Sequence, residues 1–153
     1  TGGKWTTFRR MAQDTVNKAI SLGKLPKKEC KTADLKIHGA KENPDLSNHL
    51  YIYGSDQPEI QNLINEDSSL GEKLHPRLDF LKAEVVFAAR HELARTVDDV
   101  LARRVRMLFM DAKAAIESAP EVAALLAKEL EKDEAWKEKQ VADFKEIAKH
   151  YTI

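Results

Sequence analysis

The start of the chain combines residue types that suit the binding of an anion. Residues 1–7 read TGGKWTT, and an amphipathic helical pattern follows, closed by Gly23. Gly2 and Gly3 allow backbone conformations with positive φ, a helix N-terminus presents unpaired N–H groups, and Lys4 adds a full positive charge. The sequence therefore predicts an anion site. Because the spacing does not match the phosphate-binding loop G-x-x-x-x-G-K-[ST], a capped surface helix is the alternative interpretation.

Charged residues interrupt the apolar faces of a second strong pattern. Residues 81–89 and 97–112 carry apolar residues at the three-to-four spacing of amphipathic helices. If the helical spacing is extended, Glu92 falls on the apolar face of the first helix and Arg104 falls on that of the second. A buried charge without a partner is costly, so we pair Glu92 with Arg104, or with Arg103 if the helix is rotated slightly.

Thr96 and Asp99 mark the start of the second of these helices. A threonine followed three residues later by an acidic residue is a variant of the capping box. Asp99 and Arg103 are four residues apart, which is the spacing of a local ion pair on a helix.

These charges allow two interpretations. In the first, the ion pairs are structural and fix how two core helices dock. In the second, the arginines of this region converge on an anion-binding site made of Arg95, Arg103, Arg104 and Arg106.

Composition argues against several classes of function. Lys+Arg and Asp+Glu both number 25, so the net charge is zero and we expect no nucleic-acid partner. The five histidines and the one cysteine, Cys30, show no metal-site spacing, so we expect no metal, no internal disulfide and a reducing compartment. The longest apolar run, residues 122–127, is too short to span a bilayer, and no signal segment opens the chain. We expect a cytoplasmic protein that is soluble or peripheral to a membrane.

Helical patterns and breakers divide the chain into three parts. Residues 1–23 hold the glycine turn and its helix, residues 24–47 form an irregular linker rich in breakers, and residues 48–153 form a helical domain. The length allows one domain with a proper core and a short appendage. The fold class expected is all-α, with orthogonally packed helices.

Caps and prolines suggest the helix limits within residues 48–153. We expect short helices capped by Ser47 and by Ser55 or Asp56, and a helix that starts at Pro120. A last amphipathic helix should run over residues 133–150.

Two stretches resemble the FAD-dependent glycerol-3-phosphate dehydrogenases of the aerobic, quinone-linked type. RHELARTVDDVLARRVRMLFMD, residues 90–111, is similar to their C-terminal helical domain, where a run of acid, Thr, Asp and paired Arg recurs. TGGKWTTFR, residues 1–9, is similar to the segment T-G-G-K-x-T-T-[YF]-R that closes their flavin-binding domain. The resemblance is close over residues 1–10 and 81–115 and weak over residues 24–74.

The resemblance implies roles for the first residues. Residues 1–23 would be the C-terminal end of an FAD-binding domain, with Gly2, Gly3, Lys4 and Thr6 at the flavin. Lys4 would reach either the flavin or the glycerol phosphate of the substrate, and Thr6 and Thr7 would cap the helix. Family members often carry Gly at the position of Glu131, so the turn there is expected to differ. No catalytic residue is expected in this chain.

The resemblance also implies the activity of a longer parent protein. It would oxidise sn-glycerol 3-phosphate to dihydroxyacetone phosphate, with FAD as hydride acceptor and a quinone as electron sink; a relative that uses oxygen is the alternative. The chain has no G-x-G-x-x-G motif after a strand, so we expect an excised C-terminal portion that is inactive alone. Its partners would be the upstream FAD-binding domain and, in a homodimer, a second copy, with the parent peripheral on the cytoplasmic membrane. The rival hypothesis is a stand-alone helical protein-interaction module.

Overall fold

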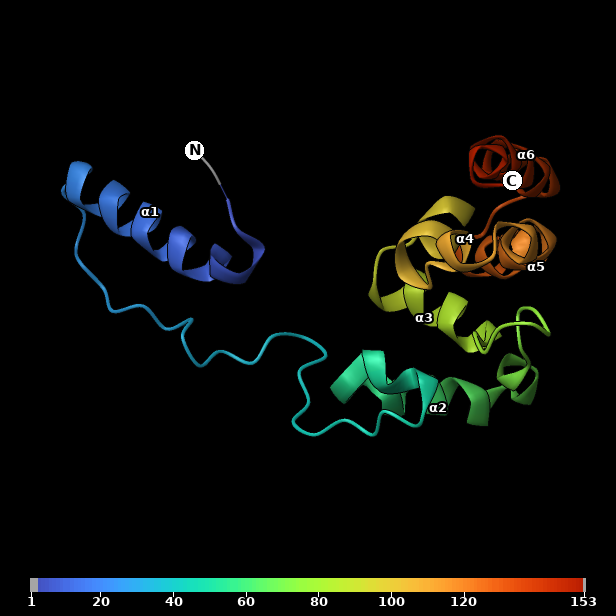
Figure 1. Ribbon diagram of the computed structural model, residues 1–153, viewed down its shortest axis with the longest axis horizontal. Helices are drawn as coiled ribbons and strands as arrows, with labels where there is room; N and C mark the ends of the chain where they lie inside the picture. The colour runs from blue at the N-terminus through green and yellow to red at the C-terminus, as the bar shows by residue number, and fades with distance from the viewer. Residues whose placement is uncertain (1–2, 153) are drawn as a thin grey trace. The chain divides into compact units, whose positions relative to one another are not determined.

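The computed structural model describes residues 3–152, and its regular elements are helical (Figure 1). Among these residues, the β-structure is one isolated bridge between Lys73 and Leu81. The all-α class expected from the sequence is therefore confirmed. The chain divides into two compact units, Thr1–Ala40 and Lys41–Ile153, and the boundary falls inside the irregular segment expected at residues 24–47.

The first unit holds one long helix, α1 (Phe8–Leu22), preceded by the 3-10 turn η1 (Trp5–Thr7). Gly23 ends α1, as expected, and its N–H donates to the carbonyl of Ala19. The expected capping by Thr7 is wrong, because its hydroxyl donates back to the Lys4 carbonyl at 3.2 Å instead of accepting an N–H of the helix. None of the residues of α1 is buried.

The second unit packs its helices across one another. In Figure 1, α5 and α6 are seen nearly end-on, whereas α2 runs across the view, so these helices cross steeply. In chain order the elements are η2 (His49–Asp56), α2 (Gln57–Glu66), η3 (Ser68–Gly71), α3 (Lys82–His91), the π-helical turn η4 (Asp99–Arg104), α4 (Met107–Met110), α5 (Ala112–Leu130), α6 (Glu134–Ala148) and η5 (Lys149–Tyr151).

Helix α3 lies between the two apolar clusters of this unit. Every residue from Ala83 to Ala89 is buried. Val85 and Ala88 belong to a cluster with η4, α4, α5 and α6, whereas Val86 and Phe87 belong to a cluster with η2 and α2. Because α3 contributes side chains to both clusters, it connects the two halves of the core. Each fully buried Phe or Val side chain contributes roughly 1.5–3 kcal/mol to stability.

The helix expected over residues 97–112 is broken, which corrects the sequence prediction. The N–H of Val105 donates to the Val100 carbonyl, five residues back, and Arg106 then adopts a left-handed conformation with φ 58°. The Arg106 guanidinium lies over the Phe109 ring, 5.7 Å from its centre. The break redirects the backbone and allows Met107 and Leu108 of α4 to be buried.

Pro120 lies inside α5 and not at the start of a helix, which corrects a second expectation. An interior proline costs roughly 3 kcal/mol, because it removes one backbone hydrogen bond and crowds the preceding turn. The buried stripe of α5 continues on both sides of it, through Ala115 and Ala119 before and Val122 and Leu126 after. Apolar burial along the whole helix therefore outweighs the local cost.

Two expected caps are also corrected. Asn48, and not Ser47, caps η2 by accepting the N–H of Leu50, while Ser47 bonds to Asp45. Asp56 precedes α2 without a capping bond from its side chain. The start of α6 is as expected, since the Asp133 side chain accepts the N–H of Trp136.

Glu131 ends α5 in a left-handed conformation, with φ 53° and ψ 49°. A residue with a Cβ is strained there by about 1–2 kcal/mol, and glycine is not. We predict that Glu131→Gly raises the free energy of unfolding by about 0.5–1 kcal/mol, after the greater freedom of glycine in the unfolded chain is subtracted. Urea unfolding monitored by circular dichroism measures it. Glu131→Ala keeps the Cβ and should bring no comparable gain; equal gains would mean that loss of charge, not backbone strain, is responsible.

Candidate functional site

The segment before α1 is open and exposed. Lys4 is extended, with φ −130° and ψ 125°, and its carbonyl accepts the N–H of Thr7 at 3.0 Å. A Cβ added at Gly3 would meet no atom within 4 Å, and Trp5 is 87% exposed while stacking on Phe8. Gly2 lies outside the described residues. The segment thus presents backbone and a lysine at an open surface, where a flat group can approach.

A groove runs along α1 within the first unit. It has a volume of about 830 Å³ and lies between α1 and the irregular residues 28–37. Ala12, Val16 and Ile20 line its helical side. Arg9 spans the groove, since its Nη1 donates to Thr32 Oγ1 at 3.3 Å and to Gln13 Oε1 at 3.0 Å. This contact holds the irregular segment beside the helix.

Two arginines satisfy the C-terminal end of α3. Leu93, in a left-handed conformation with φ 58°, turns the chain away from the helix. The Arg104 Nε and Nη2 both donate to the Glu92 carbonyl, and Nε lies 3.6 Å from the Glu92 carboxylate. Arg95 Nη1 donates to the carbonyls of Ala89 and Ala94 at 2.9 and 2.8 Å. The pairing of Glu92 with Arg104 is present, but the backbone carbonyl is the closer partner.

The other two arginines point to different partners. Arg103 lies 3.2 Å from Asp99 and 2.5 Å from Asp98, and Arg106 lies over Phe109. Thr96 and Asp99 form a reciprocal capping box, in which each side chain accepts the backbone N–H of the other residue. The four arginines therefore do not converge on an anion site, and the geometry fits the structural interpretation.

A buried carboxylate that the sequence analysis missed lies at the other end of α3. Glu84 is fully buried and accepts the N–H of Leu81 at 2.6 Å and the hydroxyl of Tyr53 at 2.9 Å. His49 Nε2 lies 3.2 Å from Oε2, the oxygen that also accepts the N–H of Leu81, and the histidine side chain is 30% exposed. The carboxylate thus joins η2 to α3 through two side chains and caps the start of α3.

Burial sets the ionisation of this network. It raises the pKa of Glu84 above its ordinary value of 4.5, although the bonds from Leu81, Tyr53 and His49 oppose the shift. The pKa of Tyr53 is also raised, by burial first and then by the charge of Glu84. Tyr53 therefore stays a hydrogen-bond donor.

The sequence contained only a weak signal for this network. Glu84 stands three residues after Leu81, which is the capping-box spacing, but an apolar residue at the N-cap position hides the pattern. The apolar stripe through Val85 and Ala88 placed Glu84 off the buried face. It is buried because a second cluster covers the opposite side of α3.

The described part of the chain shows neither a metal centre nor a membrane span. No group of three His, Cys, Asp or Glu residues among residues 3–152 could hold a metal ion. Over the same residues, no helix has the length and apolar character needed to cross a bilayer.

The capping of α3 predicts unequal effects for the two partners of the Glu92–Arg104 pair. Arg104→Met removes two donors from a part-buried carbonyl and should lower the free energy of unfolding by about 1–3 kcal/mol. Glu92→Gln leaves that carbonyl in place and removes a long, partly exposed ion pair, for which we expect about 0–1 kcal/mol. Denaturant unfolding checks both. Arg103→Met, whose side chain is more exposed, is the control and should cost less than Arg104→Met; equal losses for Arg104→Met and Glu92→Gln would make the carboxylate the main partner.

The raised pKa of Glu84 predicts a pH dependence of stability. The folded state binds this proton more tightly than the unfolded state, so the stability that it contributes is full below about pH 4.5 and is lost as pH rises through the raised pKa. Glu84→Gln should therefore lose less unfolding free energy than the wild type between about pH 5 and pH 8, by roughly 1.4 kcal/mol for each tenfold change in proton affinity. Urea unfolding across this range measures it. Tyr53→Phe retains the carboxyl and should retain the wild-type trend, while parallel profiles for wild type and Glu84→Gln would contradict the prediction.

Comparison with known proteins identifies the family. The model for the C-terminal domain of alpha-glycerophosphate oxidase matches residues 2–138. The mitochondrial glycerol-3-phosphate dehydrogenase of Arabidopsis thaliana is 33% identical over 96% of this chain and 28% of its own length. A probable mitochondrial glycerol-3-phosphate dehydrogenase of Caenorhabditis elegans is 34% identical over 84% of this chain and 21% of its own length, and that of Rattus norvegicus is 32% identical over 92% and 22%.

The chain therefore spans about a quarter of the length of these relatives. No solved structure matches it. The family model covers nine tenths of the chain, including the glycine segment, α3 and the capping arginines, and on this ground the chain belongs to the family of C-terminal domains of glycerol-3-phosphate oxidases and dehydrogenases.

Proposed function

We propose that this chain is the C-terminal part of an FAD-dependent glycerol-3-phosphate dehydrogenase, which oxidises sn-glycerol 3-phosphate to dihydroxyacetone phosphate. The observation that carries the proposal is the match of residues 2–138 to the family domain, with relatives named glycerol-3-phosphate dehydrogenase in plants and animals. The relatives are several times longer than this chain, which leaves room for a flavin-binding domain upstream.

The open segment before α1 fits a role at the flavin. When bound, FAD accepts a hydride and gathers negative charge at one edge of its ring. Gly3 has free space around it, so the backbone there can approach a flat ring closely. We assign Gly2, Gly3, Lys4 and Thr6 to the flavin edge, where a lysine charge and backbone N–H groups would stabilise the developing charge. Lys4 can equally hold the phosphate of the substrate.

The apolar face of α1 supports a partner upstream. Its residues Phe8, Met11 and Val16 are all exposed, and a single helix of fifteen residues is marginally stable in water without packing. We assign residues 1–23 to the end of the FAD-binding domain, which would cover this face. We assign the catalytic base and most substrate ligands to the same upstream domain. The chain alone would bind no FAD and oxidise nothing.

The proposal also includes a quinone as the electron acceptor of the parent enzyme and a location of that enzyme at a membrane. A quinone is dissolved in the bilayer, so a parent that reduces it works at a membrane surface as a peripheral enzyme. A parent that passes electrons to oxygen is the alternative. The plant and animal relatives are named as mitochondrial enzymes, and a cytoplasmic location of this protein stays a prediction from composition.

The test is the anaerobic visible absorbance of the full-length parent before and after addition of glycerol 3-phosphate. We expect bleaching of a flavin band, and a Lys4→Ala variant that still binds flavin should be reduced roughly 100-fold more slowly, the effect of losing one charge-stabilising donor. Lys27→Ala, which removes a lysine from the irregular segment of the same unit, is the matched control and should be reduced at the wild-type rate.

Three results would contradict the proposal in separable ways. A parent without flavin, or with flavin that glycerol 3-phosphate does not bleach, would contradict the proposed activity. An unchanged rate of flavin reduction in Lys4→Ala would contradict only the proposed role of Lys4. Retention of FAD by the 153-residue chain would contradict only the claim that the chain alone binds no FAD.

A further inference from the structure

Large apolar side chains from α4 and from the end of α6 are exposed together on the second unit. Phe109 and Met110 of α4 are 53% and 65% exposed, and Tyr151 of η5 is 49% exposed. The rings of Phe109 and Tyr151 meet edge to face, with 5.4 Å between their centres. Ile147, which is also exposed, lies one helical turn before Tyr151. We call these four residues the α4 patch.

Arg106 places a positive charge on the α4 patch. Its guanidinium lies over the exposed Phe109 ring, and its left-handed backbone sets the direction of this side chain at the start of α4. Among residues 3–152, Arg106 takes part in no ion pair, whereas Arg103 pairs with Asp98 and Asp99. A strained backbone conformation is kept where the surrounding structure or a function requires it. Here it holds an unpaired cation over an exposed aromatic ring.

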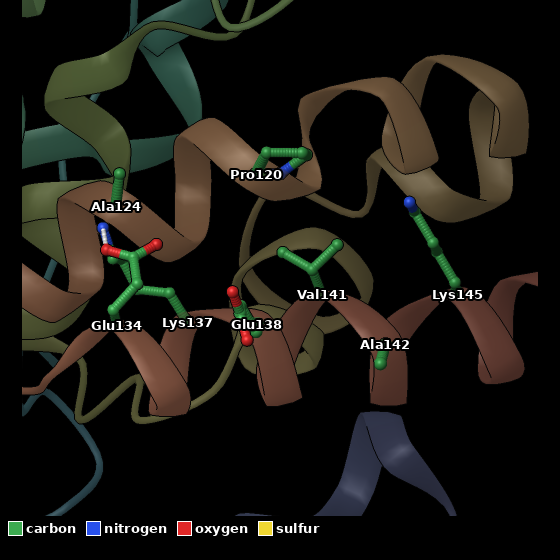
Figure 2. Close-up of a pocket in the computed structure, with 8 residues that line it drawn as sticks. All are labelled: Pro120, Ala124, Glu134, Lys137, Glu138, Val141, Ala142 and Lys145. Atoms are coloured by element: carbon green, nitrogen blue, oxygen red, sulfur yellow. Dashed lines mark ion pairs between the residues drawn. The ribbon is translucent and has the colours of Figure 1, made fainter.

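The groove between α5 and α6 offers a contrast on the same unit (Figure 2). Pro120 and Ala124 of α5 form one wall, and Val141 of α6 points toward Pro120 across the groove. Its apolar side chains are small, and its rim carries acidic and basic residues of α6, of which Lys137 pairs with Glu134. The α4 patch instead combines large apolar side chains with one unpaired charge.

This combination is typical of a surface that another protein surface covers. Aromatic residues, methionine and arginine are enriched in the buried parts of protein interfaces, and arginine and tyrosine often contribute most of the binding energy. An arginine covered by an apolar surface needs an opposite charge, so the partner surface should carry a carboxylate that reaches Arg106.

The charge of the α4 patch argues against two other occupants. In a symmetric contact with a second copy, the two Arg106 side chains would approach one another, and like charges across an interface are unfavourable. Recognition of anionic lipids uses clusters of four to eight basic residues. Here Lys149, the basic residue two positions before Tyr151, pairs with Glu146, which leaves Arg106 as the unpaired cation beside Phe109.

We propose that the upstream FAD-binding domain of the parent protein covers the α4 patch, through an apolar surface with a carboxylate that pairs with Arg106. The chain spans only 21–28% of the length of three of its relatives, so most of the parent's surface lies outside it. The identity of the covering domain rests on the function proposed above. The new element is the surface of the helical domain that it contacts, which is distinct from α1 and from the segment before it.

The three methionines of the chain allow a test, because hydrogen peroxide oxidises a methionine thioether faster when the side chain is exposed. Met110 is 65% exposed, Met11 of α1 is 38% exposed and Met107 is buried. Peptide mass spectrometry measures the oxidation rate of each in the 153-residue chain and in the full-length parent. We expect Met110 to be oxidised about tenfold more slowly in the parent than in the 153-residue chain, and Met107 to be slow in both.

Substitutions in the parent test the contacts of the α4 patch. Phe109→Ser removes the central ring and Arg106→Gln removes the cation, so each should raise the oxidation rate of Met110 toward its value in the 153-residue chain. Ile52→Ser is the matched control, because Ile52 is 54% exposed and lies on η2, which packs in the other apolar cluster. It should leave Met110 protected. Slow oxidation of Met107 in every variant verifies that α4 remains folded.

Each contrary result has its own meaning. Equal Met110 oxidation rates in the parent and the 153-residue chain would overturn the proposal. Protection that is lost when the parent is diluted would assign the α4 patch to a second copy, and protection that requires vesicles of anionic phospholipid would assign it to a membrane; either result would overturn the upstream domain as occupant. Unchanged protection in Arg106→Gln would overturn the acidic partner. Flavin bleaching by glycerol 3-phosphate decides the proposed activity separately, and Met11 reports whether α1 is covered.

Discussion

Helix α3 is buried from Ala83 to Ala89, and side chains satisfy polar backbone groups at both of its ends. A buried N–H or carbonyl without a partner costs roughly 1–3 kcal/mol, which is a large fraction of the stability of a small domain. At the first end the fully buried Glu84 accepts the N–H of Leu81, and at the other end Arg95 and Arg104 donate to carbonyls of the last turn and the residues after it. The neighbouring elements of the second unit are positioned so that Glu84, Arg95 and Arg104 reach the backbone groups at the ends of α3.

This requirement explains the geometry on either side of α3. Tyr53 and His49 come from η2, so the short turn has to lie against α3 for the carboxylate to be satisfied. Arg104 comes from the π-helical turn η4, whose start is fixed by the capping box of Thr96 and Asp99. The π turn adds one residue to the helical turn, and after Val105 the chain continues with the left-handed Arg106. The irregular backbone between α3 and α5 thus brings an arginine to the part-buried end of α3.

Features that depend on neighbouring residues could be predicted from the sequence, and features that depend on distant ones could not. The irregular segment before residue 48, the start of the last helix near residue 133 and the capping box of Thr96 and Asp99 are local, and the sequence indicated each of them. Glu84 was missed because the apolar stripe through Val85 and Ala88 indicates one buried face, whereas a second cluster covers the opposite side of α3. Pro120 was misplaced because burial along nineteen residues of α5 outweighs one proline. The left-handed residues Arg106 and Glu131 have no sequence signal, since glycine is the residue that normally marks such positions.

The two units differ in how much apolar surface they bury by themselves, and this difference supports the division of roles that we propose. The second unit encloses two apolar clusters and satisfies the ends of its central helix with its own side chains. In the first unit, α1 buries none of its residues, although Phe8, Met11 and Val16 form a regular apolar face. An amphipathic helix gains most of its stability from packing of that face, so α1 needs a partner surface in a way that α5 and α6 do not. The glycine segment and Lys4 stand directly before α1. In the function that we propose, a surface that covers α1 would lie close to Lys4 along the chain, so one contact would stabilise the helix and bring the lysine near the flavin.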